Sequence, residues 1–139
     1  MALPALRKSV AWQKAMQLSA AVYEATRCFP SDERFGLTNQ LRRAAVSVPS
    51  NIAEGRGRLT PGEFLHFLGI ARGSALEVET QLELAMTLGF GNRAELEATQ
   101  ELAIEVGTIL NASVSTLRER IASARRSGVL PRFTDHTND

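Results

Sequence analysis

The chain has 139 residues, one cysteine and a formal net charge of +1. A chain of this length can form one domain that buries most of its apolar surface without disulfides or a structural metal, and a lone cysteine excludes a disulfide scaffold. The near-neutral charge excludes a nucleic-acid binder that works by total charge alone, so any such role depends on where the charges lie.

Three features bear on where the protein works. The first twelve residues include basic side chains but no apolar run long enough for a signal sequence. No later stretch is long and apolar enough to span a bilayer. Because the single thiol of Cys28 also fits a reducing compartment, we expect a cytoplasmic protein that does not bind a membrane.

The first element is expected after a flexible lead-in over residues 1–8. Ser9 is a suitable N-cap for a helix over residues 9–29. Pro30 cannot continue that helix, because its ring removes a backbone donor and restricts the preceding residue. Cys28 would then lie in the last turn, where a free thiol is usually an inert core or boundary residue.

A second helix is expected over residues 32–56. Pro49 lies inside it, and a proline within a helix typically costs about 3 kcal/mol. The apolar pattern nevertheless continues in phase on both sides of the proline, which predicts one helix kinked at Val48 and Pro49. The apolar residues that recur at spacings of three and four, as in a helix with one face on a core, are Leu37, Leu41, Ala45, Val48 and Ile52.

A row of polar side chains runs beside that apolar stripe, and a matching set occurs in the next helix. A mid-helix glycine costs about 1 kcal/mol relative to alanine, so Gly73 in this set indicates a close helix crossing, within the bundle or between protomers. The row predicts a polar seam or subunit interface that fixes helix register or subunit orientation, with a ligand site as the alternative. Its members are Gln40, Arg43, Ser47, Asn51, Glu54, Arg72, Gly73, Ser74 and Glu77.

The third helix is expected over residues 61–88. Thr60 is a suitable N-cap, Pro61 fits the first helical position and Glu63 completes a capping box. Gly89 can end the helix in the left-handed conformation.

The fourth helix is expected over residues 93–127, with Asn92 as its N-cap. It would be roughly 50 Å long, so its end should project beyond the shorter helices. Residues 129–139 are expected to form a disordered tail.

Four amphipathic helices joined by short turns predict an all-α, antiparallel up-down-up-down four-helix bundle over residues 9–128. This topology places the starts of the first and third helices and the ends of the second and fourth at one end. Basic residues gather there, and acidic residues gather at the opposite end. The candidate nucleic-acid-binding residues at the basic end are Arg7, Lys8, Arg56, Arg58, Arg118, Arg125 and Arg126.

Two explanations remain open for this basic end. Fourteen arginines against two lysines suit bidentate contact with phosphate groups. The helix dipole favours basic residues at helix C-termini, which explains Arg118, Arg125 and Arg126 but not the basic residues elsewhere. Aromatic residues are not interleaved with the cations, so contact with the backbone of RNA or DNA is expected rather than base reading.

Residues that could carry catalysis or hold a metal are few. His66 and His136 are the only histidines, and no Glu-x-x-His pair of the di-iron bundle type occurs. We therefore expect no enzymatic activity, no metal and no cofactor, and a hydrolase or metalloenzyme is the least favoured alternative.

Two long segments of the sequence resemble a known family. LTNQLRRAAVSVPSNIAEGRGR, followed by EFLHFLGIARGSALEVETQLELAMTLGF, is similar to the four-helix bundle proteins encoded by intervening sequences within bacterial 23S ribosomal RNA genes. WQKAM and FPSDERFGL also fit, so the resemblance covers roughly residues 10–90, and the last helix agrees in pattern rather than in motif.

The resemblance implies properties that spacing does not show. Members of that family form ring-shaped homopentamers, and relatives in diversity-generating retroelements are accessory proteins that bind a reverse transcriptase and nucleic acid. We therefore expect a non-enzymatic, cytoplasmic homo-oligomer whose basic end binds RNA or DNA, as an accessory to another protein. The alternative is a protein–protein interaction scaffold that does not bind nucleic acid.

Overall fold

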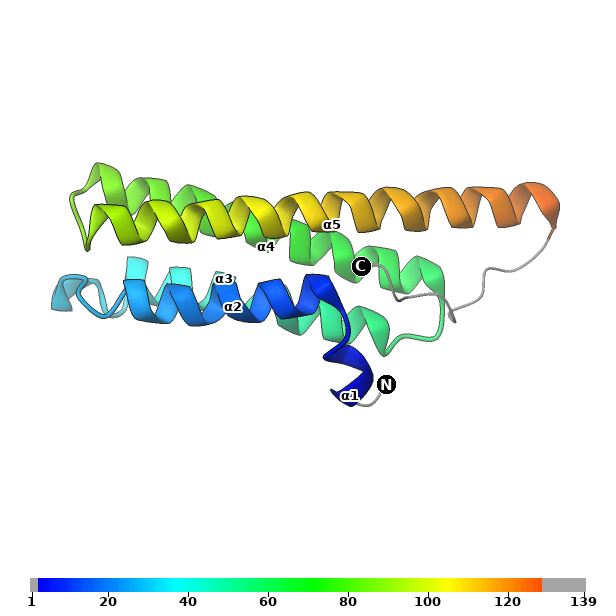
Figure 1. The fold of residues 1–139 in the computed structure, drawn as a ribbon, viewed down its shortest axis with the longest axis horizontal. Coiled ribbons are helices and arrows are strands. Elements are labelled where there is room, and N and C mark those ends of the chain that lie inside the picture. Colours follow the sequence, from blue (N-terminus) through cyan, green and yellow to red (C-terminus); the bar gives the residue numbers. More distant parts are fainter. Residues whose placement is uncertain (1–2, 129–139) are drawn as a thin grey trace.

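Four long helices lie side by side in residues 3–128, the part of the chain that this computed structural model describes (Figure 1). Every regular element in this range is helical. None of these helices has the length and apolar character needed to cross a membrane. The elements are α1 (Leu3–Leu6), α2 (Val10–Ala25), the short 3₁₀ helix η1 (Ser31–Glu33), α3 (Leu37–Arg56), α4 (Pro61–Thr87) and α5 (Arg93–Ser127).

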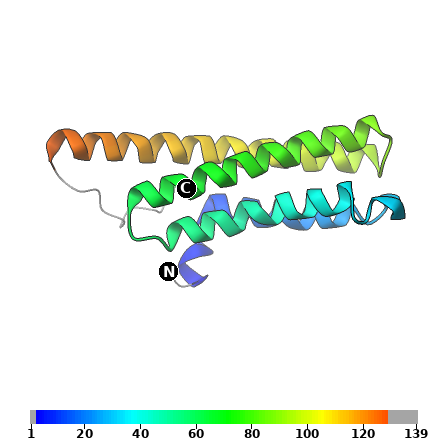
Figure 2. The same cartoon turned by 180° about the vertical axis from the view of Figure 1, so that it is seen from behind.

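The four long helices form an antiparallel up-down-up-down bundle. Each of α2, α3, α4 and α5 packs mainly on its two neighbours, in the cyclic order α2, α3, α4, α5. Consecutive helices run in opposite directions, as the views from the front and from behind show (Figures 1 and 2). The chain order therefore brings the starts of α2 and α4 to the same end as the ends of α3 and α5.

The core follows the apolar stripes of all four helices. Leu18, Leu41, Leu82 and Leu110, one from each helix, are fully buried. The same cluster continues through every residue of the α3 stripe expected from sequence. These stripes need one another, because each helix alone would expose its apolar face to water.

Side-chain caps mark the starts of three helices. Ser9 accepts a hydrogen bond from the backbone of Trp12 at 3.2 Å, and Thr60 accepts one from Glu63 at the same distance. Asn92 accepts one from the Glu95 backbone at 2.9 Å. Each cap satisfies a backbone N–H that has no partner in the first helical turn.

The N-terminal region differs from the expected flexible lead-in. Leu3–Leu6 form a helical turn, and Leu6 is buried. The first long helix ends at Ala25 rather than near residue 29. Phe29 lies in the turn that follows and packs on Phe90, with ring centroids 5.9 Å apart. Cys28 consequently lies in the turn and is exposed, so the expectation of a core or boundary thiol was wrong.

The second long helix begins later than residue 32. Ser31–Glu33 form a separate 3₁₀ turn, and Gly36 precedes the first residue of α3. The Glu33 carboxylate accepts a hydrogen bond from the Leu37 backbone at 2.9 Å and so caps α3 from outside. The helix then continues through Pro49 to Arg56, and the kink at Val48 and Pro49 stays a prediction.

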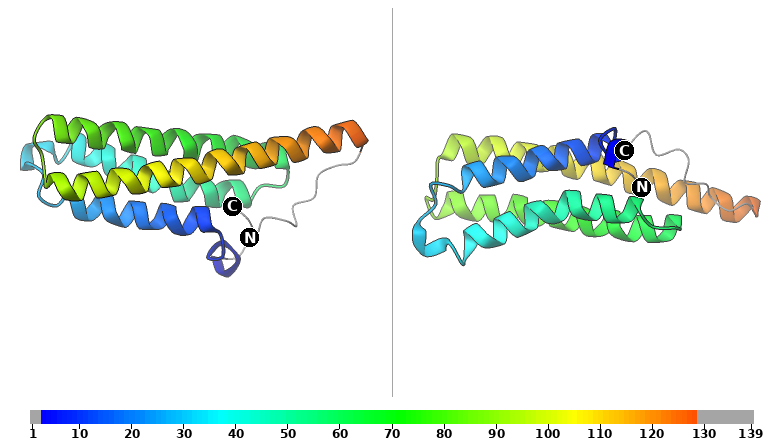
Figure 3. Two further views of the ribbon diagram at one scale, coloured as in Figure 1. Left: turned by 45° about the horizontal axis from the view of Figure 1, so that its top comes forward. Right: turned by 90° about the horizontal axis from the view of Figure 1, so that it is seen from below.

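The end of α5 projects beyond the turn between α3 and α4 (Figures 1 and 3). Leu117 is its last buried residue. Gly128 ends the helix with φ of 71°, a left-handed conformation that glycine adopts without strain. The expected tail over residues 129–139 lies outside the described residues.

Candidate functional site

The basic end is the end of the bundle where α2 and α4 begin and α3 and α5 end (Figure 1). Arg7 and Lys8 lie between α1 and α2, Arg56 ends α3 and Arg58 follows it, and the remaining candidates lie on the last turns of α5. Every candidate is exposed except Arg56. The topology thus places residues from the two ends of the described chain at one end of the molecule.

Arg56 does not face solvent, contrary to the sequence-based expectation. Only 7% of its surface is exposed, and its guanidinium lies over the Phe64 ring, 5.7 Å from the centroid. Burial lowers its pKa to about 10, because desolvation penalises the charged form. A guanidinium enclosed in this way belongs to the packing of α3 on α4 rather than to a surface for phosphate groups.

Two other cations at this end have local partners. Arg58 pairs with Glu54 at 2.6 Å and lies over the Phe67 ring, 4.7 Å from the centroid. Arg126 pairs with Glu119 at 3.2 Å. Glu54 therefore binds the turn after its own helix and does not join the polar seam, which corrects its expected place.

The remaining candidates have unneutralised charge. In residues 3–128, no acidic side chain forms an ion pair with Arg7, Lys8, Arg118 or Arg125. Arg7 and Lys8 lie between α1 and α2, whereas Arg118 and Arg125 lie in the C-terminal turns of α5. The available cations therefore form two groups at one end rather than one continuous patch.

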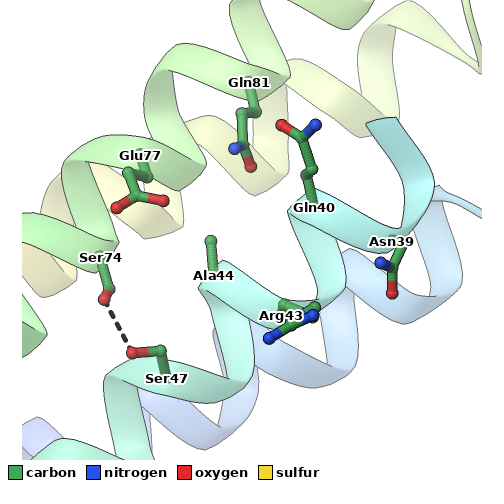
Figure 4. A pocket seen from close by; sticks show the side chains of 8 residues that line it. All are labelled: Asn39, Gln40, Arg43, Ala44, Ser47, Ser74, Glu77 and Gln81. Carbon is green, nitrogen blue, oxygen red and sulfur yellow. Dashed lines mark hydrogen bonds between the residues drawn. The ribbon is translucent and has the colours of Figure 1, made fainter. Parts of the chain in front are cut away.

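The polar seam exists in part, between α3 and α4. Ser47 and Ser74 share a hydrogen bond of 2.8 Å between their hydroxyl oxygens (Figure 4), and Asn51 donates to the Ser47 hydroxyl at 2.9 Å. Arg72 instead donates to Asn111 on α5, at 3.4 Å, and so lies outside the seam. Of these hydrogen bonds, only the one between Ser47 and Ser74 joins α3 directly to α4.

Three further predicted seam residues, Gln40, Arg43 and Glu77, line an open groove between α3 and α4 of about 340 Å³, whereas Gly73 lies outside its lining. Figure 4 shows Gln40 and Arg43 on α3, with Glu77 and Gln81 on α4 across from them. Within the described residues, neither Arg43 nor Glu77 takes part in an ion pair. We call this hollow the α3–α4 groove; its lining is Asn39, Gln40, Arg43, Ala44, Ser47, Ser74, Glu77 and Gln81.

Asn39, Ala44 and Gln81 also line the groove and were not among the residues predicted from the sequence. The Gln81 carbonyl oxygen is buried and has no hydrogen-bond partner in residues 3–128. Gln81 is four residues after Glu77, so both side chains lie on one face of α4. This spacing could have identified Gln81 as a lining residue from the sequence.

Glu79 lies at the opposite flank of α4, against α5. Its carboxylate is the nearest group to Gly107, where an added Cβ would be 3.7 Å from the Glu79 oxygen. Desolvation by burial raises the pKa of Glu79. The folded state therefore binds a proton at Glu79 more readily than the unfolded chain does.

Replacing Glu79 by glutamine is expected to raise stability at neutral pH. The ionised carboxylate disfavours folding above the folded-state pKa, and this penalty disappears once the carboxyl group is protonated in both states. The gain should therefore vanish as the pH falls below the unfolded-state value of roughly 4. Urea midpoints of wild type and Glu79→Gln across this range measure it, with exposed Glu101→Gln as the control; an equal gain at acidic pH would contradict it.

The described residues contain no group of three or more histidine, cysteine, aspartate or glutamate side chains that could hold a metal ion. His66, the histidine considered for catalysis, is exposed and packs edge-on against Phe67, with centroids 5.2 Å apart. This contact is with an aromatic ring, so it supplies no carboxylate that could orient the His66 imidazole for catalysis.

Comparisons with known proteins agree with the fold. The chain is similar, at 22% identity and a TM-score of 0.68, to a crystal structure of a protein of unknown function from the S23 ribosomal protein family of Bacteroides thetaiotaomicron. That match covers 76% of this chain and 98% of the other. No curated protein matches the chain.

A family model matches residues 7–112, which include α2, α3, α4 and the first part of α5. The model describes the 23S rRNA-intervening sequence protein. The projecting, arginine-bearing part of α5 lies beyond the matched range. The chain therefore belongs to the 23S rRNA-intervening sequence protein family.

Proposed function

We propose that this protein is a non-enzymatic, cytoplasmic homo-oligomer that binds the phosphate backbone of RNA or DNA through its basic end, as an accessory to another protein. The observation that supports the proposal is that the topology places two groups of exposed cations, one before α2 and one in the last turns of α5, at the same end of the bundle. Arg7, Lys8, Arg118 and Arg125 are exposed and have no ion pair in residues 3–128.

The helix dipole accounts for arginines near the end of α5. It does not account for Arg7 and Lys8, which precede the start of α2, where the dipole disfavours cations. An arginine-rich surface suits phosphate, because the planar guanidinium can donate two parallel hydrogen bonds. Repetition of this end in an oligomer would multiply the number of phosphate contacts, and binding would then depend steeply on salt.

Salt-dependent binding of mixed RNA and DNA fragments tests the proposal. In filter-binding titrations, wild type should retain nucleic acid at low ionic strength, with affinity falling linearly on a log–log plot against salt. Replacing both Arg118 and Arg125 by glutamate should remove about two phosphate contacts and flatten the slope by roughly 1.5–2.

The control is Arg27→Glu, at an exposed arginine beyond the opposite end of α2. This substitution changes the net charge by the same amount as each of the two substitutions on α5. The slope of affinity against salt should nevertheless stay nearly unchanged. Absence of retention at low salt would contradict the proposal. Retention of a protein partner after nuclease treatment and in high salt, without nucleic-acid binding, would support the interaction scaffold instead.

A further inference from the structure

A hollow of about 490 Å³ lies between α2 and α3, on the flank of the bundle. Small-molecule sites typically have volumes of roughly 300–1,000 Å³, so a small ligand fits here. No acidic side chain of the described residues lines this hollow, and most of the lining side chains carry hydrogen-bond donors. We call it the α2–α3 hollow; its polar and charged lining residues are Tyr23, Asn39, Arg42, Arg43, Ser47 and Ser50.

Contacts with the end of α2 hold Arg42 in place. Its Nε donates to the Thr26 hydroxyl oxygen at 2.9 Å, and its guanidinium carbon lies 4.6 Å from the centroid of the Tyr23 ring. Its Nη2 donates to the Tyr23 carbonyl oxygen at 3.4 Å. A guanidinium fixed in this way loses little conformational freedom when its remaining N–H groups bind a ligand.

The positive charge of the hollow is not neutralised inside the described chain. Neither Arg42 nor Arg43 forms an ion pair in residues 3–128. Two adjacent guanidinium groups can donate to several oxygens of one phosphate group, and a phosphate monoester carries a charge of about −1.5 to −2 at pH 7. A single carboxylate has fewer oxygens and less charge, so the lining favours phosphate.

The adjoining α3–α4 groove offers hydrogen-bond acceptors instead. It shares Asn39, Arg43 and Ser47 with the hollow, so one ligand can extend from the hollow into the groove. Figure 4 shows Glu77 and Gln81 extending from α4 toward α3. Glu77 forms no ion pair in residues 3–128, so its carboxylate can accept hydrogen bonds from hydroxyl groups of a ligand. The same carboxylate would repel a second phosphate group.

We propose that the α2–α3 hollow binds the phosphate group of a small phosphate monoester, with hydroxyl groups of the same ligand in the α3–α4 groove. Arg42 and Arg43 hold the phosphate group, and Glu77 accepts hydrogen bonds from the hydroxyl groups. A sugar phosphate combines these features, because it has one anionic end and a neutral remainder rich in hydroxyl groups.

This site is separate from the basic end. Arg43 precedes Arg56 on α3 by about 20 Å along the helix axis. Because Glu77 disfavours a second phosphate group, the site suits one phosphate rather than a nucleic-acid strand.

Isothermal titration of the full chain with four probes tests the inference: ribose 5-phosphate, inorganic phosphate, ribose and gluconate. Ribose 5-phosphate should bind at least about tenfold more tightly than inorganic phosphate, because its hydroxyl groups add hydrogen bonds to a charged acceptor. Ribose should not bind detectably, and gluconate, which has a carboxylate in place of the phosphate, should bind more weakly than ribose 5-phosphate.

Three substitutions assign the contacts. Arg42→Gln and Arg43→Gln should each weaken the binding of ribose 5-phosphate and of inorganic phosphate at least about tenfold. Arg43 is exposed and forms no hydrogen bond or ion pair in residues 3–128, so Arg43→Gln should leave thermal unfolding unchanged. Glu77→Ala should weaken the binding of ribose 5-phosphate without weakening that of inorganic phosphate. Arg34→Gln, at an exposed arginine outside the lining, is the control and should leave both affinities unchanged.

The outcomes separate this inference from the proposed function. No binding of ribose 5-phosphate at millimolar concentrations, or binding that Arg43→Gln leaves unchanged, would overturn the inference. Tighter binding of gluconate than of ribose 5-phosphate would also overturn it. Loss of RNA or DNA retention in Arg43→Gln, in a chain that does not bind ribose 5-phosphate, would assign the hollow to the polyanion surface and overturn the small-ligand site. Binding of ribose 5-phosphate by a chain that retains no RNA or DNA at low salt would support this site and contradict the nucleic-acid role.

Discussion

Leu82→Ala is expected to lower the free energy of unfolding by about 2–5 kcal/mol. Leu82 lies on α4, within the bundle core, and its side chain is fully buried. The substitution removes apolar atoms from the core and leaves a cavity that the surrounding helices can fill only in part. Urea unfolding followed by far-UV circular dichroism, at one protein concentration, measures the change.

The matched control is Leu84→Ala on the same helix. Leu84 is 46% exposed, so the same change of side chain removes little from the core and should cost less than about 1 kcal/mol. Similar losses at the two positions would show that the packing of α4 differs from the one described.

Arg56→Glu is expected to cost about 3 kcal/mol or more, because it removes a guanidinium packed over an aromatic ring and leaves a carboxylate in a poorly hydrated site. Arg56 is 7% exposed and lies over Phe64. The variant should therefore unfold at lower denaturant concentration, and loss of nucleic-acid retention by it would report unfolding rather than a lost phosphate contact.

Arg58→Glu, two residues later, is the comparison. Its partner Glu54 is on the surface, and exposed ion pairs contribute at most about 1 kcal/mol. The denaturation midpoint should therefore change much less than for Arg56→Glu. Equal midpoints for the two variants would mean that Arg56 is not part of the core.

Local chemistry made several elements predictable. Thr60, Pro61 and Glu63 define the start of α4, and Asn92 caps α5, as the residue types alone indicate. The apolar stripe of α3 crosses Pro49 without a change of phase, and the structure has one helix there. These features depend on residues within a few positions of one another, so no knowledge of the rest of the chain is needed.

The boundaries around residues 26–36 depended on distant contacts. Phe29 lies after the end of α2 and packs on Phe90, a residue distant in the sequence that follows α4. Helix propensity alone cannot weigh that contact against continuing the helix. The same limit made Cys28 look like a core residue.

Some residues of the candidate sites could likewise be predicted from local sequence, and others depended on distant contacts. The sequence identified Ser47, Asn51 and Ser74 as seam residues through their spacing, and its candidate cations lie at one end of the bundle in two groups. It could not distinguish Arg56 from Arg58, because two arginines on either side of a glycine have the same local pattern. Only the packing of α4 on α3 encloses one guanidinium and leaves the other at the surface.

By itself, the sequence determined the helical character of this protein, the order of its helices and their alternating directions, because apolar period, caps and turn length are local properties. Tertiary structure alone decided which polar groups satisfy one another and which face outward. Gly73 illustrates the difference, since its cost to the helix is evident from the sequence, whereas the open space beside it appears only once the other three helices are in place. Burial and pairing depend on every neighbouring element at once, and spacing along one helix does not contain that information.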